Sequence, residues 1–126
     1  MKRLSCLVVD DSRVIRRIAV DMLSTLGFQV AEAEDGLMAV QQCSRQVPDL
    51  VLLDWNMPEM DGLSCLRALR GMALEPRPLV VMCTTENGMD KICEALNSGA
   101  DEYIMKPYDR DVLLGKLEQL GLMEPA

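Results

Sequence analysis

Five polar side chains of this sequence stand directly after short apolar runs. They are three acids, a hydroxyl and an ammonium: Asp10, Asp11, Asp54, Thr84 and Lys106. Three carboxylates held together repel one another, which raises a pKa or recruits a cation. Oxygen ligands without histidine or thiolate favour Mg²⁺, and a carboxylate beside Mg²⁺ can attack phosphorus to form an aspartyl phosphate. A hydroxyl and an ammonium would stabilise the charge of the transferred phosphoryl group.

Each of these side chains also has an ordinary structural interpretation. Asp10 and Asp11 precede a helical segment, where acids commonly cap the first turn and interact with the helix dipole. Asp54 could begin a turn, Thr84 could cap a helix, and Lys106 could be a solvated charge. Each alternative is reasonable for one residue, but coincidence is a poor explanation for all five. A joint site is therefore the favoured interpretation.

The elements that must position these residues alternate along the chain. Short apolar, β-rich runs predict five strands, at residues 4–9, 28–33, 50–53, 79–83 and 101–105. Amphipathic segments between and after them predict five helices: one capped by Ser12 and closed by Gly27, then 36–46, 63–70 and 89–98, and a last one capped by Asp109. This alternation predicts a parallel sheet covered on both faces. Functional groups of such a sheet gather outside the carboxyl ends of its strands, so the five polar residues should meet at one edge.

The helical segments carry apolar residues at helical spacing, which predicts the side chains that face the sheet. The expected stripes are Ile15, Ile18, Met22, Leu23 and Leu26 in the first helix, Ile92, Ala95 and Leu96 in the fourth, and Val112, Leu113, Leu117 and Leu120 in the last.

Composition limits the function classes. The chain has 126 residues, 49% of them hydrophobic, and shows no linker or repeat, which predicts one domain over residues 1–126. A formal charge of −7 argues against nucleic acid, whose binding needs lysine and arginine at phosphates. The chain has no histidine, so zinc sites and histidine-based acid–base catalysis lose their commonest residue.

The cellular compartment follows from the N-terminus and the cysteines. The basic start is followed by an apolar run that stops at Asp10, too early for an export signal, and no stretch is long enough to cross a bilayer. The five cysteines are an odd number without a CxxC pair. We therefore expect a cytoplasmic protein without membrane insertion, whose cysteines serve as small hydrophobic residues.

Four motifs together resemble those of response-regulator receiver domains, and of the single-domain, CheY-like type in particular. They are Leu7-Val8-Val9-Asp10-Asp11-Ser12, Asp54-Trp55-Asn56-Met57-Pro58-Glu59-Met60-Asp61-Gly62, Val80-Val81-Met82-Cys83-Thr84 and Tyr103-Ile104-Met105-Lys106-Pro107. The resemblance covers essentially the whole chain in order. It implies a flavodoxin-like, doubly wound fold, and the family supplies the expected strand order 2-1-3-4-5.

The resemblance also implies roles at the site. Asp54 would be the phosphoacceptor. Asp11 and Asp54, with the backbone carbonyl of Asn56, would ligate Mg²⁺ directly, and Asp10 would act through the metal's water shell. Lys106 would pair with Asp54 before phosphorylation and with the phosphoryl group afterwards. A cis peptide bond between Lys106 and Pro107 is left open.

A conformational switch is implied as well. Thr84 would move toward the phosphoryl group, and Tyr103 would swing inward and reshape the face formed by the fourth helix, the fifth strand and the fifth helix. A half-buried strand tyrosine would look the same in sequence. Asn56 and Glu86 would tune the lifetime of the acyl phosphate. Thr85 departs from the small residue usual in the family, which leaves exchange rates open, and Tyr108 replaces a frequent Phe.

The resulting functional prediction is a response regulator of a two-component system or phosphorelay. It is not an enzyme in the ordinary sense, although it would catalyse its own phosphorylation and dephosphorylation. Its donor would be a sensor histidine kinase or a histidine phosphotransfer protein. Its target would be another protein, either a flagellar motor switch or another regulator, and the chain would act as a monomer. A phosphorelay shuttle or an adaptor in development or stress signalling is the alternative.

Two rival functions share parts of this pattern. A phosphatase of the haloacid-dehalogenase type also uses an aspartate nucleophile with Mg²⁺, but it normally has a second acid at the position of Asn56, and this chain lacks a cap domain. A phosphorylation-independent receiver scaffold would have lost one or more site residues, and all of them are present.

Overall fold

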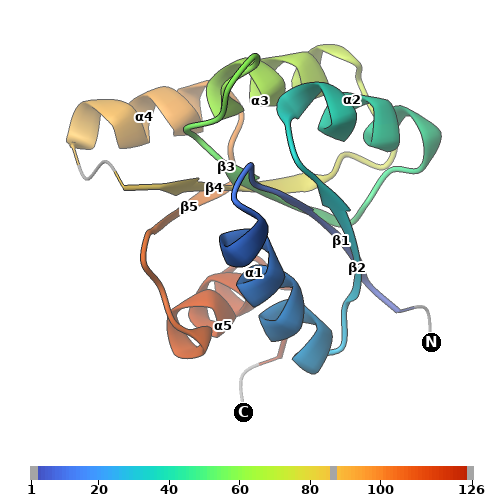
Figure 1. The fold of residues 1–126 in the computed structure, drawn as a ribbon, viewed down its shortest axis with the longest axis vertical. Coiled ribbons are helices and arrows are strands. Elements are labelled where there is room, and N and C mark those ends of the chain that lie inside the picture. Colours follow the sequence, from blue (N-terminus) through green and yellow to red (C-terminus); the bar gives the residue numbers. More distant parts are fainter. Residues whose placement is uncertain (1–2, 86–87, 125–126) are drawn as a thin grey trace.

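The computed structural model describes residues 3–85 and 88–124 as a five-stranded sheet with helices on both faces (Figure 1). The strands are β1 (Ser5–Val9), β2 (Gln29–Ala33), β3 (Leu50–Asp54), β4 (Leu79–Thr84) and β5 (Glu102–Met105). The helices are α1 (Arg13–Thr25), α2 (Gly36–Arg45), α3 (Gly62–Gly71), α4 (Met89–Asn97) and α5 (Arg110–Gln119). All ten predicted elements are confirmed, and no predicted boundary differs from the observed one by more than one residue.

The sheet has the order β2-β1-β3-β4-β5, and every neighbouring pair is parallel. The predicted order 2-1-3-4-5 is thus confirmed. Because all strands run the same way, their carboxyl ends lie along one edge of the sheet. β2 and β5 are the outer strands, so β5 has an open side.

Two apolar cores hold the helices to the sheet. Alternate residues of each strand point to opposite faces. Leu53 and Met82 belong to the core under α2, α3 and α4, whereas Leu52 and Val81 belong to the core under α1 and α5. Figure 1 shows this division, with α2, α3 and α4 on one side of the sheet and α1 and α5 on the other. Within the described residues, no helix has the length and apolar character needed to span a membrane.

Side-chain caps explain where four of the helices begin. Ser12, Asp35, Asp61 and Asp109 each accept a hydrogen bond from a backbone N–H three residues later, which satisfies a free donor of the first turn. The predicted caps at Ser12 and Asp109 are confirmed. Helix α4 has Gly88 as its N-cap and therefore lacks such a bond.

The predicted apolar stripes were wrong at four positions. The side chains of Ile15, Ile18, Leu96 and Val112 are exposed, by between 41% and 51%. A helix resting on a sheet buries only a narrow stripe. In α1 that stripe is made by Ala19 and Leu23, and Ile15 and Ile18 lie outside it.

The cysteine prediction holds for four of the five residues. Cys6, Cys43, Cys65 and Cys83 are buried, whereas Cys93 on α4 is exposed. Burial raises the pKa of Cys43 to about 11 and that of Cys65 to about 12. These two thiols therefore stay protonated and behave as small apolar groups.

Candidate functional site

The predicted polar residues do meet at the carboxyl edge of the sheet. Asp54 and Thr84 are the last residues of β3 and β4, and Asp10 and Lys106 directly follow β1 and β5. Asp10, Asp54 and Thr84 are the three buried polar or charged residues of the described chain, with at most 6% exposure. Buried polar groups are costly without partners, so their number at one edge already marks it as unusual.

Lys106 joins two of the acids. Its Nζ lies 2.9 Å from Oδ2 of Asp10 and 2.9 Å from Oδ1 of Asp54, and donates a hydrogen bond to each. Its backbone N–H donates to the carbonyl of Thr84, and the peptide bond to Pro107 is cis. The family resemblance implies a partner for Lys106 only at Asp54, so its contact with Asp10 is an addition.

The two carboxylate oxygens of Asp10 make different contacts, one in the turn before α1 and one in the candidate site. Its Oδ1 accepts a hydrogen bond from the backbone N–H of Ser12 at 2.8 Å, which orders the turn into α1. Its backbone carbonyl accepts a bond from Arg16. Its other carboxylate oxygen faces Lys106. Asp10 therefore does not cap α1, whose N-cap is Ser12, but orders the turn before it, and one carboxylate oxygen remains for the site.

The three acids form a cluster that suits a metal ion. One carboxylate oxygen each from Asp10, Asp11 and Asp54 lies within 4.8 Å of the others, and Asp11 is exposed to solvent. All three potential ligands are carboxylate oxygens, and the cluster is open to water on the side of Asp11. This combination fits Mg²⁺, which takes one or two carboxylates and keeps several waters.

Burial and charge shift the pKa of two groups. Burial raises the pKa of the Asp54 carboxyl, the charges of Asp10 and Asp11 raise it further, and the hydrogen bond from Lys106 offsets this only in part. Burial alone would lower the pKa of Lys106, but hydrogen bonds to Asp10 and Asp54 outweigh it and raise the pKa. Lys106 is therefore a permanent cation, while the acids retain an excess of negative charge.

The loop after β3 is shaped by close backbone packing. Gly62 donates its N–H to the carbonyl of Trp55, and a Cβ at Gly62 would overlap the carbonyl oxygen of Asp54. Glu59 has a φ of 67°, in the left-handed region. The loop thus folds back tightly onto the strand end, and Asn56, two residues after Asp54, is exposed.

The remaining predicted residues lie around this centre. Thr85 is exposed, and Tyr103 on β5 is half-buried. Thr84 and Tyr103 lie on the same face of the sheet, because Thr84 pairs with Met105 and Met82 pairs with Tyr103. Glu86, predicted to tune phosphoryl lifetime, lies outside the described residues.

An apolar groove beside the site was missed from the sequence. It has a volume of about 310 Å³ and is lined by Ile15, Ile18, Ala19, Met22, Thr85, Lys106, Pro107 and Tyr108. It exists because Ile15 and Ile18 turn outward from α1 and not toward the sheet. The only sequence signal was an apolar set too wide for one buried stripe.

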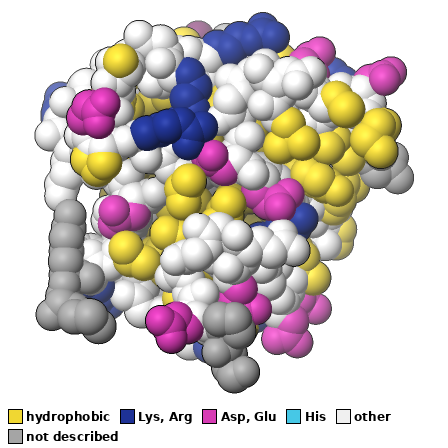
Figure 2. Space-filling model, turned by 180° about the vertical axis from the view of Figure 1, so that it is seen from behind, with side chains coloured by type: hydrophobic (Ala, Val, Ile, Leu, Met, Phe, Trp, Pro, Cys, Tyr) yellow, Lys and Arg dark blue, Asp and Glu magenta, His cyan; other side chains and the backbone are white. Residues whose placement is uncertain are grey.

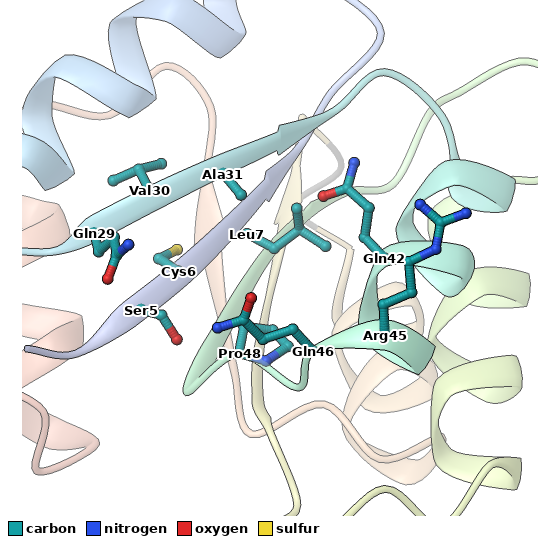
Figure 3. A pocket seen from close by; sticks show the side chains of 10 residues that line it. All are labelled: Ser5, Cys6, Leu7, Gln29, Val30, Ala31, Gln42, Arg45, Gln46 and Pro48. Carbon is teal, nitrogen blue, oxygen red and sulfur yellow. The ribbon is translucent and has the colours of Figure 1, made fainter.

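A second hollow, of about 290 Å³, lies between β1, β2 and the end of α2 (Figure 3). Leu7 and Ala31 lie under it, and Gln42, Arg45 and Gln46 stand along one side. It contains none of the residues predicted to act, so the acidic edge remains the candidate site.

Comparison with known proteins agrees with this geometry. Residues 6–118 match the family described as "Response regulator receiver domain". The chain is 42% identical to chemotaxis protein CheY1 of Helicobacter pylori over 89% of this chain and 92% of the relative. It is 38% identical to chemotaxis protein CheY of Listeria monocytogenes over 92% and 97%.

Solved structures show the same fold. Chemotaxis protein CheY4 of Vibrio cholerae has a TM-score of 0.88 at 30% identity, over 94% of this chain and 98% of that one. A CheY from Borrelia burgdorferi, solved in complex with CheX, BeF3 and Mg²⁺, has a TM-score of 0.88 at 28% identity, over 95% and 90%. With its acidic edge, its fold and its relatives in agreement, this chain belongs to the response regulator receiver domain family and is a CheY-like response regulator.

Proposed function

We propose that this chain, as one receiver domain over residues 1–126, accepts a phosphoryl group on Asp54 and passes the change to a protein partner. The observation that carries the proposal is the double contact of Lys106 with Asp10 and Asp54 beside the acidic cluster. It supplies a carboxylate nucleophile, a fixed positive charge and a set of oxygen ligands at one edge. These are the groups that phosphoryl transfer to an aspartate requires.

Asp11, Asp54 and the backbone carbonyl of Asn56 would hold Mg²⁺, with Asp10 acting through its water shell. When bound, the ion neutralises charge on the phosphoryl oxygens and on the carboxylates. The raised pKa of Asp54 supports this assignment, because a divalent cation would relieve the charge excess that contributes to the rise.

The chain's own residues position the reaction. Lys106 holds Oδ1 of Asp54, so Oδ2 is the oxygen that attacks phosphorus. The bond from phosphorus to the donor's nitrogen breaks as the new phosphorus–oxygen bond forms. Lys106 then pairs with the phosphoryl group, as a compact charge that two acids have fixed in place. The same site supports water attack on the acyl phosphate, so the domain would catalyse its own phosphorylation and dephosphorylation.

Thr84 and Tyr103 would transmit the change at the phosphorylation site to the protein surface. They share one face of the sheet on neighbouring strands, so a movement of Thr84 toward the phosphoryl group leaves space that the Tyr103 ring can enter. The surface that would change is formed by α4, β5 and α5. Met89 on α4 and Val112 on α5 are exposed there, by 71% and 46%. Figure 2 shows apolar side chains gathered on the right of the view, next to the start of α4.

Three residues would set the lifetime of the phosphorylated form. Asn56, two residues after Asp54, and Thr85, directly after Thr84, are both exposed, and their side chains would restrict or orient an attacking water. Glu86 is proposed for the same role on the basis of the family resemblance alone.

The phosphoryl donor would be a histidine kinase or a histidine phosphotransfer protein in the cytoplasm. The apolar groove next to Lys106 supports this. A donor protein that must bring its histidine to Asp54 needs an adjacent surface on this domain to bind. The relatives are named for chemotaxis. We therefore propose a motor or chemotaxis protein as the target of a monomeric switch.

The decisive experiment is incubation with acetyl phosphate and Mg²⁺ followed by intact mass measurement. The wild-type chain should gain one acid-labile phosphoryl group, and an Asp54→Asn variant should gain none. A wild-type chain that gains no mass would exclude the switch and favour the scaffold. Repeated turnover of a small phosphate ester would favour the phosphatase.

A further inference from the structure

The switch residue Tyr103 is held by two charged side chains. Nζ of Lys116 on α5 lies 4.5 Å from the centroid of the Tyr103 ring, and 3.3 Å from Oε1 of Glu102. The same Glu102 oxygen accepts the backbone N–H of Tyr103 at 3.0 Å. The carboxylate therefore fixes both the backbone of Tyr103 and the ammonium that lies over its ring.

This arrangement crosses the open edge of the sheet. Tyr103 lies on the face covered by α4, whereas α5 packs on the other face with Leu113 and Leu117. β5 is the outer strand, so Lys116 can reach around it to the ring. Figure 1 shows α4 and α5 on opposite sides of β5. The ring is thus held at the edge of the sheet by a residue from the opposite layer.

Burial makes the contact stronger than an ordinary surface pair. The side chains of Lys116 and Glu102 are each 21% exposed, so water competes with them less than at an open surface. In contrast, Arg17 and Asp21 form a pair that is 73% and 65% exposed. A cation over an aromatic ring is attractive because the ring face carries negative charge.

We propose that Lys116 and Glu102 form a clasp that holds the Tyr103 ring at the sheet edge and so opposes its inward movement. The clasp therefore sets the free-energy difference between the outward and inward positions of the Tyr103 ring. To move behind Thr84, the ring must leave the ammonium, and that loss adds to the free energy of the active arrangement. This inference rests on the proposed switch function of Tyr103. Lys116 and Glu102 are positioning residues and do not touch the phosphoryl group.

The test uses the whole chain labelled with 3-fluorotyrosine. The sequence has two tyrosines, so a Tyr108→Phe variant assigns the Tyr103 fluorine resonance. Beryllofluoride with Mg²⁺ serves as the probe that stands for the phosphoryl group. Lys116→Met keeps an unbranched side chain of similar length and removes its charge, and Lys116→Arg retains a cation.

Lys116→Met should move the Tyr103 resonance toward its position in the beryllofluoride-saturated chain. It should also lower the beryllofluoride concentration for half-saturation by about two- to five-fold, the equivalent of one lost cation–π contact. Lys116→Arg should resemble wild type. Glu102→Gln, which keeps an acceptor for the Tyr103 N–H, should give a smaller change in the same direction.

Lys91→Met is the matched control. It deletes the same charge from a lysine that lies 5.3 Å from the ring centroid of Trp55, and it should leave the Tyr103 resonance unmoved. An unmoved resonance in Lys116→Met, or an unchanged half-saturation point, overturns the clasp. The resonance comparison needs no phosphoryl donor, so it is separate from the mass measurement that tests the proposed function.

Discussion

The two ends of the sheet both gather charged side chains from distant parts of the chain, but their charges are balanced differently. At the carboxyl end, three acids face the single ammonium of Lys106. At the amino end, the single carboxylate of Asp101 faces the guanidinium groups of Arg70 and Arg77 at 3.0 and 2.9 Å. One end has an excess of negative charge, and the other pairs its acid with two cations.

The amino end is closed by its own hydrogen bonds. Asp101 also accepts the backbone N–H of Val80 at 2.8 Å, and Arg70 donates to the carbonyls of Gly99 and Pro78. These bonds join α3, β4 and the turn before β5 into one cluster. The amino-end cluster therefore stabilises the fold. The acidic carboxyl end has unpaired negative charge, so binding a cation and a phosphoryl group there still lowers its free energy.

The largest expected effect is the loss of the amino-end carboxylate. Asp101→Ala should lower the free energy of unfolding by about 3 to 4 kcal/mol, because it leaves a partly buried guanidinium and a backbone N–H without their acceptor. Urea unfolding gives the value. The folded variant should still take up a phosphoryl group on Asp54.

Asp21→Ala is the control for that change. Its ion pair with Arg17 is exposed, so its loss should cost under about 0.5 kcal/mol. A similar cost for the two variants would mean that the amino-end cluster is no more than a surface pair.

A second comparison uses the two ends of α3. Gly62→Ala should destabilise by about 3 kcal/mol, because the new Cβ meets the backbone at Asp54 and the loop must move. Phosphoryl uptake should slow as well. Gly71→Ala meets no atom within 4 Å and should be neutral or stabilise by about 0.5 kcal/mol. Thermal unfolding of both variants measures the difference, and equal effects would contradict the tight fit of the loop.

Mg²⁺ should act only at the carboxyl end. At about 100-fold above its dissociation constant it should stabilise the chain by about 2.7 kcal/mol, since it binds the folded acids and not the unfolded chain. Asp11→Asn should remove most of this gain, and Asp101→Asn should leave it intact. Thermal unfolding across a Mg²⁺ titration is the measurement. A gain that survives Asp11→Asn would place the ion elsewhere.

The smallest expected effect is that of the Asp54 carboxyl on the free energy of unfolding when no metal is bound. Its pKa is raised by folding, so the protonated form is favoured in the folded chain, and stability falls as pH rises from the unfolded value through the folded one. Asp54→Asn should therefore stabilise the chain at pH 7, by an amount on the order of 1 kcal/mol. The gain should vanish toward acidic pH, below the unfolded pKa. Unfolding in chelator at several pH values tests this, and a variant less stable than wild type at pH 7 would refute it.

Local patterns in the sequence determined the elements and their order. Apolar runs and helical spacing depend on residues a few positions apart, so they predicted all five strands and all five helices. Caps such as Ser12 and Asp109 depend on the next turn and were predicted for the same reason. The convergence of Asp10, Asp54 and Lys106 followed from parallel strands having their carboxyl ends at one edge.

Only the tertiary structure decided the contacts between distant residues. Lys106 is 96 positions from Asp10 and 52 from Asp54 in the sequence. That it contacts both acids depends on strand register and on the turn after β5. Asp101, expected as a strand residue, instead precedes β5 and holds two arginines. The outward turn of Ile15 and the reach of Lys116 to Tyr103 likewise depend on how helices rest on the sheet. Nothing in local spacing encodes those distances, because they are set by packing between layers.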